Sequence, residues 1–253
     1  MQILHDTLLI FRHQMRLSLR NPVWVVIGLI QPILYLAFFG PLLTGIARSP
    51  GFPTGNAWQV FVPGLLVQLG LFGAAFVGFG IIAEMRMGVL ERMRVTPVSR
   101  LALLLGRVLR DAVVLFVQSV LLLAAGIAFG LRAPVPGILI GLSFVLLLAV
   151  SLASLSYATG LLTKSEDAFA PLLNMIMVPL LLLSGILLPM SLAPRWLDAL
   201  SRANPFRYIV EAMRAAFLGQ YATGEVWWGV VVALMLAVLS VAIGARTFRR
   251  ENV

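Results

Sequence analysis

Long apolar runs separated by short charged segments are the dominant pattern along this chain. Each run could hold the roughly 20 apolar residues that a helix needs to cross the hydrocarbon core of a membrane. The charge-free stretches cover residues 21–47, 49–83, 112–131, 133–163, 168–194 and 226–245. The pattern therefore predicts six spanning helices, near residues 23–47, 58–82, 108–130, 137–162, 170–189 and 226–245.

The runs lack the regular alternation of apolar and polar residues that a membrane-spanning β-barrel requires. Leu180-Leu181-Leu182-Leu183 is one example. Residues 23–47 also form a longer apolar run than a secretory signal contains. We therefore expect an all-α, polytopic membrane protein in which residues 1–253 form one transmembrane domain.

Composition agrees with a membrane location and excludes several classes of protein. The 253 residues are 60% hydrophobic and 11% charged, and their mean hydropathy is +1.00. A soluble enzyme or a disordered chain needs many more charged residues. The net charge is +9, but the charges lie between apolar runs and form no basic face for nucleic acid. The chain has no cysteine, so it has no disulfide, thiolate metal site or cysteine nucleophile.

The distribution of basic residues predicts the orientation. If six spans cross the membrane, thirteen of the nineteen Lys and Arg residues lie on the side of the two termini, and six lie on the other side. The positive-inside rule then places both termini in the cytoplasm. Four arginines within residues 190–225 oppose this assignment.

Residues 1–20 have the pattern of an amphipathic helix at the membrane interface. Arginine and histidine side chains occupy one face, and apolar side chains recur at helical spacing on another. The apolar face consists of Leu4, Leu8, Phe11, Met15 and Leu19.

Residues 83–100 join the second and third predicted spans. Glu84, Gly88, Glu91 and Val95 follow a helical spacing, and Pro97 ends the helix. This segment is either a solvated loop helix whose arginines fix the topology, or a lever that docks on a cytoplasmic partner.

Residues 184–219 predict an external, partly re-entrant helical hairpin between the last two spans. Phe206, Val210, Met213 and Phe217 share one face. We expect Arg207, Glu211 and Arg214 to share another face and to form ion pairs there. The hairpin is either a lid that packs on the spans or a gate.

The chain carries no energy-converting chemistry of its own. Lys164-Ser165 is no phosphate-binding loop, because Thr163 and Ala158 stand where that motif requires glycine. Proton- or sodium-coupled carriers place acids or histidines within the bilayer. The deepest acid here is Asp111, which we interpret as a carboxylate near a helix start, paired with arginine.

Two motifs together resemble the ABC-2 type transporter permeases. Glu84-x-x-x-Gly88-x-x-Glu91-Arg92 with Thr96-Pro97 is similar to their coupling region. Ser184-Gly185 followed by Pro189, Trp196-Leu197, Asn204-Pro205 and Glu211-x-x-Arg214 is similar to their last external loop. The daunorubicin/doxorubicin-resistance drug exporters are the most similar subgroup. Glu211 departs from the aspartate that is more frequent at its position.

This resemblance implies a permease subunit that exports a hydrophobic or amphiphilic, drug-like compound across a bacterial plasma membrane. Two copies of a separate ATPase subunit would hold the ATP and magnesium, and this chain would hold no cofactor. The implied contacts with the ATPase are Glu84, Arg86, Gly88, Glu91, Arg92, Thr96, Pro97, Lys164 and Glu166. The implied external gate consists of Pro189, Trp196, Asn204, Pro205, Arg207, Glu211 and Arg214.

The second permease would be another copy of this chain or a paralogue. We expect a homodimer through the first and fifth spans, where Gly28, Gly40, Ser184 and Gly185 would allow close approach. Three alternatives stay open at this point. The cargo could be a lipid-linked glycan or another lipid, the chain could be an ion-coupled carrier or a channel, or it could be a lipid-modifying membrane enzyme.

Overall fold

The described part of the chain is built from helices, as the sequence predicts. The structure is a computed structural model that describes residues 2–20, 23–46, 56–88, 99–187 and 189–250. Within these ranges, six helical segments are long and apolar enough to cross a membrane. These spans are formed by α2 (Val23–Ile46), α3 (Ala57–Ala75) with α4 (Gly78–Arg86), α6 (Arg100–Ala128), α7 (Val135–Thr163), α8 (Glu166–Leu183) and α11 (Gly224–Arg250).

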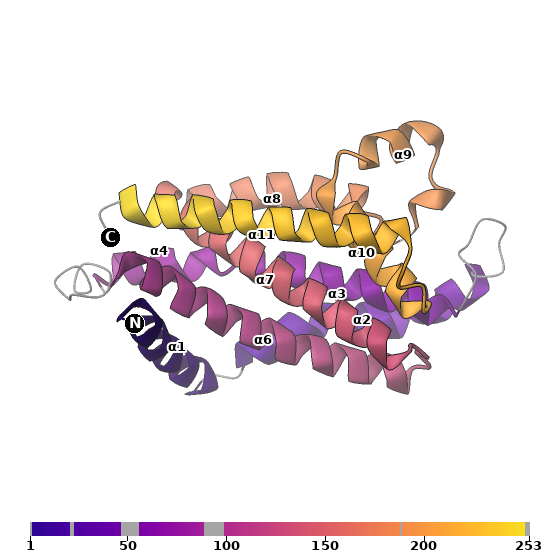
Figure 1. Cartoon of the computed structure of the whole chain (residues 1–253), viewed down its shortest axis with the longest axis horizontal. Coiled ribbons are helices and arrows are strands. Elements are labelled where there is room, and N and C mark those ends of the chain that lie inside the picture. The colour runs from indigo at the N-terminus through magenta and orange to yellow at the C-terminus, as the bar shows by residue number, and fades with distance from the viewer. Residues whose placement is uncertain (1, 21–22, 47–55, 89–98, 188, 251–253) are drawn as a thin grey trace.

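Both termini lie at the same end of this bundle, which we call the terminal end (Figure 1). Helix α1 (Gln2–Arg20) lies there against α6, where the backbone of Thr7 and the side chain of Ile10 approach Gly106. The predicted interface helix is therefore present. Its apolar face is only partly covered by the rest of the chain, since Leu4 and Leu19 are 78% and 72% exposed whereas Phe11 and Met15 are half-buried.

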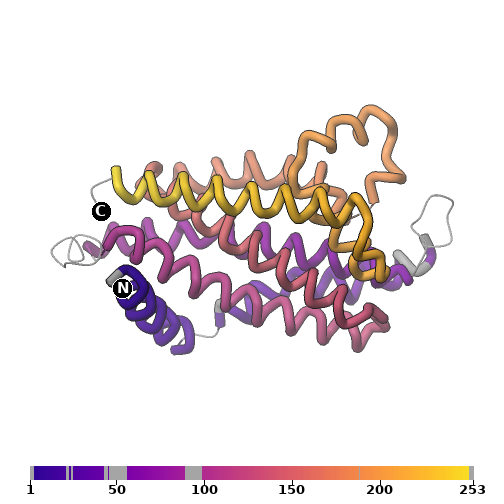
Figure 2. Tube along the Cα trace, viewed as in Figure 1, coloured from indigo at the N-terminus to yellow at the C-terminus, as the bar shows by residue number. Residues whose placement is uncertain are grey.

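Helix α7 lies at the centre of the bundle and contacts α3, α4, α6, α10 (Pro205–Phe217) and α11. Helices α2 and α8 are the least covered spans, and many of their apolar side chains face outward. The short helices η1 (Met190–Leu192) and α9 (Arg195–Ser201) belong to a segment that projects near the end opposite the termini (Figure 2). We call that end the hairpin end.

The second span is interrupted between α3 and α4, which the sequence did not predict. The hydroxyl of Ser156 on α7 bridges the break. It accepts a hydrogen bond of 2.8 Å from the backbone N–H of Gly78 and donates one of 2.5 Å to the carbonyl of Ala75. Within a membrane, backbone groups freed by a break need such partners.

The largest differences between predicted and observed boundaries are at one end of α6 and one end of α8. Helix α6 begins at Arg100 rather than near residue 108, because Arg107 is accommodated inside the bundle by an ion pair with Glu84. Helix α8 ends at Leu183 rather than near residue 189, because Gly185 takes a left-handed backbone conformation with φ +75°.

Candidate functional site

Two segments far apart in the sequence meet at the terminal end. Arg86 lies in the last turn of α4 and Glu166 in the first turn of α8, and their side chains form an ion pair of 3.5 Å between Nη1 and Oε1. Lys164 ends α7 in a left-handed conformation with φ 54° and is exposed. The structure therefore brings Arg86, Lys164 and Glu166 to one surface.

Glu84 has a different position from the one expected of a docking residue. Its carboxylate pairs with Arg107 on α6, whose side chain is only 2% exposed. Glu84 therefore faces the bundle and connects α4 to α6. Gly88 follows α4 with φ +67°, a conformation that favours glycine. The remaining expected coupling residues lie outside the described residues: Glu91, Arg92, Thr96 and Pro97.

Asp111 is paired with arginine, as predicted, but it lies about three turns into α6 rather than near its start. One carboxylate oxygen contacts Nη1 of Arg110 at 2.9 Å. The other accepts a hydrogen bond of 2.5 Å from the hydroxyl of Tyr157 on α7. Both oxygens of this buried acid therefore have partners.

At the hairpin end, Arg207 joins α9 to α10. It forms ion pairs of 2.7 Å with Asp198 on α9 and with Glu211 one turn along α10. Hydrogen bonds from Arg202 and Arg207 hold the pKa of Asp198 below its ordinary value. The predicted Arg207–Glu211 pair is therefore present, and Asp198 is a second acid that pairs with Arg207.

Asn204 and Pro205 start α10. The side chain of Asn204 accepts a hydrogen bond of 3.0 Å from the N–H of Phe206 and donates one of 2.8 Å to the carbonyl of Leu180 on α8. Pro205 occupies the first helical turn, where its missing N–H removes no helical bond. Pro189 is buried, whereas Trp196 is 68% exposed.

The expectation that Arg214 lies on a solvated, charged face is wrong. Its side chain is buried, and Nε donates a hydrogen bond of 2.8 Å to the carbonyl of Val60 on α3. Nη2 donates to the carbonyls of Gly185 at 2.8 Å and Ile186 at 3.1 Å. These last two carbonyls follow the end of α8. Burial lowers the pKa of Arg214 to about 10, so the guanidinium stays charged near neutral pH.

Helix α10 is inserted into the bundle rather than laid over it. All four residues of its predicted apolar face are buried, which confirms that face: Phe206, Val210, Met213 and Phe217. Gly137 on α7 and Gly229 on α11 make room for the helix. A Cβ at Gly137 would lie 2.2 Å from the carbonyl oxygen of Ala216, and one at Gly229 would lie 2.3 Å from the Cβ of Ala212.

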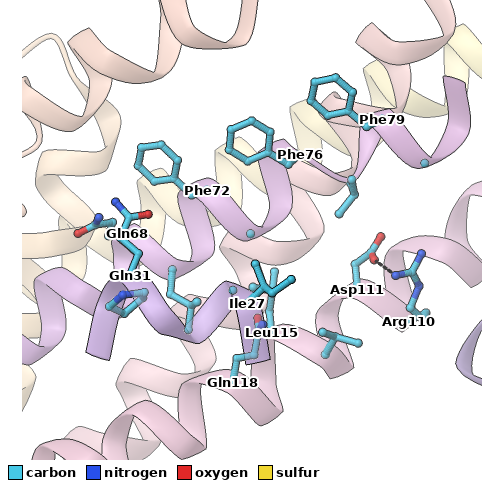
Figure 3. Close-up of a pocket in the computed structure, with 17 residues that line it drawn as sticks. Ile27, Gln31, Gln68, Phe72, Phe76, Phe79, Arg110, Asp111, Leu115 and Gln118 are labelled. Carbon is cyan, nitrogen blue, oxygen red and sulfur yellow. Dashed lines mark ion pairs between the residues drawn. The ribbon is translucent and has the colours of Figure 1, made fainter. Parts of the chain in front are cut away.

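A cavity of about 690 Å³ lies between α2, the α3–α4 break and α6 (Figure 3). Phe72, Phe76 and Phe79 line it, with ring centroids 6.2 and 6.0 Å apart and interplanar angles of 24° and 15°. The three rings therefore form a row of similarly oriented faces. Ile27 and Phe76, also in the lining, are 48% and 41% exposed, so the cavity opens on the side of the bundle.

Polar groups lie at the two ends of this cavity. The Arg110–Asp111 pair lies beyond Phe79, and Gln31 and Gln68 lie beyond Phe72 (Figure 3). Gln68 is 2% exposed, and its amide nitrogen and oxygen have no hydrogen-bond partner within the described residues. Sequence reasoning missed this cavity. The signal was available, because Gln68, Phe72, Phe76 and Phe79 follow one helical face.

The small residues expected at a subunit interface have intramolecular neighbours. A Cβ at Gly28 would meet Nε2 of Gln118 at 2.5 Å, and one at Gly40 would meet the ring of Trp58 at 2.0 Å. Ser184 and Gly185 are buried near the end of α8. Gly40, Ser184 and Gly185 therefore serve packing within the chain, whereas Gly28 is exposed and stays available for contact between copies.

Comparison with known proteins gives consistent matches. A family model described as ABC-2 type transporter matches residues 5–218. A relative from Cyanophora paradoxa, named as transport permease ycf38, is 27% identical over 77% of this chain and 68% of its own length. The daunorubicin resistance ABC transporter permease protein DrrB1 of Streptomyces coeruleorubidus is 23% identical over 91% of this chain and 81% of its own.

Proposed function

The chain belongs to the ABC-2 type transporter family, and from this premise we propose that it is the membrane subunit of an ATP-driven exporter. It moves a hydrophobic or amphiphilic, drug-like compound outward across a bacterial plasma membrane. Two separate ATPase subunits bind ATP and magnesium and drive the movement. A second permease, most simply another copy of this chain, completes the pathway.

The Arg86–Glu166 ion pair is the observation that carries this proposal. It joins, in one surface at the terminal end, the two segments for which the family resemblance implies contact with the ATPase. The excess of basic residues on the side of the termini supports a cytoplasmic position for that surface. An ATPase that docks there contacts the ends of α4 and α7 and the start of α8 together.

Two observations favour a drug-like cargo and external energy. DrrB1 is named for daunorubicin resistance, and it aligns with most of this chain. In addition, both carboxylate oxygens of Asp111 are engaged by Arg110 and Tyr157. An ion-coupled carrier needs an intramembrane acid that can exchange its proton or ion.

The test is reconstitution with an ATPase that carries a complete phosphate-binding loop and is encoded beside this chain. We expect co-purification, vanadate-sensitive ATP hydrolysis and ATP-dependent uptake by inside-out vesicles of daunorubicin or of an uncharged fused-ring amphiphile. The control replaces the phosphate-loop lysine of the ATPase, which should abolish both activities. Uptake driven by a proton gradient without ATP would contradict the proposal.

Orientation is tested separately in intact cells. The exposed Trp196 in the projecting segment is replaced by cysteine, and the chain has no cysteine of its own. We expect Trp196→Cys to react with a membrane-impermeant maleimide from outside. Reaction only after the cells are opened would place the termini outside instead.

A further inference from the structure

We propose that the cavity between α2, α3–α4 and α6 binds one flat, uncharged aromatic amphiphile through its ring system and an amide-like edge. This inference rests on the proposed function only in identifying the bound molecule as cargo. The cavity volume of about 690 Å³ lies within the range of small-molecule sites, roughly 300–1,000 Å³.

The phenylalanine row determines the shape of the ligand. Phe72, Phe76 and Phe79 lie at nearly constant spacing and present similarly oriented rings (Figure 3). Aromatic groups gain additional attraction from offset or edge contacts with such rings. A rigid fused-ring system can contact successive phenylalanines at once, and it loses less conformational entropy on binding than a flexible acyl chain.

Gln68 determines the polar group of the ligand. A buried amide without a partner is costly, particularly in a membrane. Its nitrogen can donate and its oxygen can accept, so a group with a donor beside an acceptor satisfies both. Amides and imides have this arrangement. The terminal torsion of glutamine is broad, which allows the amide to turn toward a ligand in the cavity.

The other end of the cavity determines the charge of the ligand. Arg110 and Asp111 neutralise each other at 2.9 Å, and Tyr157 occupies the second carboxylate oxygen. An added charge on the ligand would therefore lack a free counter-charge there. The exposed lining residues Ile27 and Phe76 place the opening on the side of the bundle. The ligand therefore enters from that side rather than along the bundle axis.

The test uses 1,8-naphthalimide, a flat molecule with an imide N–H between two carbonyls, and its N-methyl derivative. Gly80 lines the cavity and a Cβ there meets nothing within 4 Å, so Gly80→Cys provides a thiol without distortion. Gly45 on α2 is equally open but does not belong to the lining, and Gly45→Cys is the matched control. The chain has no native cysteine to interfere.

The purified permease is labelled with N-ethylmaleimide in lipid nanodiscs, without ATPase or ATP. We expect naphthalimide to slow labelling of Gly80→Cys and to leave Gly45→Cys unchanged. Loss of the imide donor should weaken protection roughly two- to tenfold, the value of one hydrogen bond. In the Gln68→Leu background this difference between the two compounds should disappear. Gln68→Leu removes an unpartnered buried amide, so the fold should tolerate it.

Phe76→Ala should also weaken protection, whereas Phe116→Ala, at an exposed position of α6 outside the lining, should not. Equal slowing at both cysteine positions would show partition into the bilayer and would overturn the site. The same conclusion follows if the two compounds still differ in Gln68→Leu. Protection that persists when no ATPase activity can be reconstituted would leave the site valid and the exporter function wrong.

Discussion

Glu84 and Arg107 form an ion pair that links the last turns of α4 to the interior of α6. Arg107 is almost fully enclosed, whereas Glu84 keeps 22% of its side-chain exposure. The carboxylate is therefore the main counter-charge for a buried guanidinium. This relationship makes Glu84 a structural residue at the base of the coupling segment.

Replacing Glu84 should consequently destabilise the fold. Removing one partner of a buried pair leaves the other uncompensated, and we expect Glu84→Gln to cost about 3 kcal/mol. Glu166→Gln breaks the exposed pair with Arg86 and should cost less than about 1 kcal/mol. Thermal unfolding in detergent, followed by loss of monodisperse protein, compares the two variants. Similar midpoints for both would show that the Arg107 charge is compensated elsewhere.

Gly88 should be sensitive to any side chain because of its backbone. A left-handed conformation costs a non-glycine residue roughly 1 kcal/mol or more, and Gly88 has φ +67°. We expect Gly88→Ala to redirect the chain after α4 and to uncouple ATP hydrolysis from transport at normal expression. Gly45→Ala, at an open helical position outside the cavity lining, is the control. Charge reversal at Glu91 should uncouple transport in the same way. Normal transport by both Gly88→Ala and the Glu91 variant would refute the coupling role.

A homodimer should form through outward positions of α2 and α8. Ile30, Leu34 and Phe38 on α2 and Met175 on α8 are between 47% and 77% exposed. Single cysteines at these positions should cross-link to the same position in a second copy. Val117 on α6 is also exposed and serves as the comparison. Cross-links confined to α6 and α7 would exclude this arrangement.

Any substitution that removes the guanidinium donors of Arg214 should destabilise the folded protein. Leucine at this position leaves the carbonyls of Gly185 and Ile186 without their donor, and we expect a loss of about 2–4 kcal/mol. Lysine keeps the charge but cannot reproduce the planar geometry, so Arg214→Lys should recover only part of the loss. Arg202→Lys, at an exposed pair, should unfold at the wild-type temperature. A wild-type midpoint for Arg214→Leu would show that these carbonyls find other donors.

The attachment of α9 should weaken in acid. The pKa of Asp198 is lowered in the folded protein by Arg202 and Arg207. The stabilisation that the ionised Asp198 contributes is therefore complete above the ordinary aspartate pKa of 3.8. It is lost as the pH falls through the lower pKa of the folded protein. Hydrogen exchange of α9, corrected for the intrinsic rate, should accelerate below that value in the wild type. Asp198→Asn should exchange rapidly at every pH, and a strong acid dependence in this variant would assign the effect to another group.

The periodicity and composition of the sequence were sufficient to predict the helical class, the six spans and the amphipathic helix at the N-terminus. These features depend on the apolar length of each segment, which a membrane restricts strongly. The apolar face of α10 was also predictable, because four apolar residues at helical spacing in so short a segment indicate a buried face. The Arg207–Glu211 pair followed from spacing alone.

The positions of buried polar groups could not be predicted in the same way. In the sequence, Arg214 cannot be distinguished from a solvated arginine. Its acceptors, the carbonyls of Val60 and Gly185, are identified only when the helices are placed. The interruption of the second span depends on a hydroxyl, that of Ser156, about eighty residues away. The cavity depends on the same interruption. Its phenylalanine wall could be seen in the sequence, but the facing walls from α2 and α6 could be recognised only after the helices were placed.

The Ser156 bridge also separates the second span into two helices with different contacts. Because α7 supplies the hydrogen-bonding partner at the break, α4 is aligned on α7, whereas α3 begins separately at its Asn56 cap. Phe79 and Gly80 at one end of α4 line the cavity, and Arg86 at the other end meets Glu166. Nine residues of helix measure about 13 Å. A tilt of this short helix about its contact with Ser156 would therefore change the cavity wall and the terminal surface together.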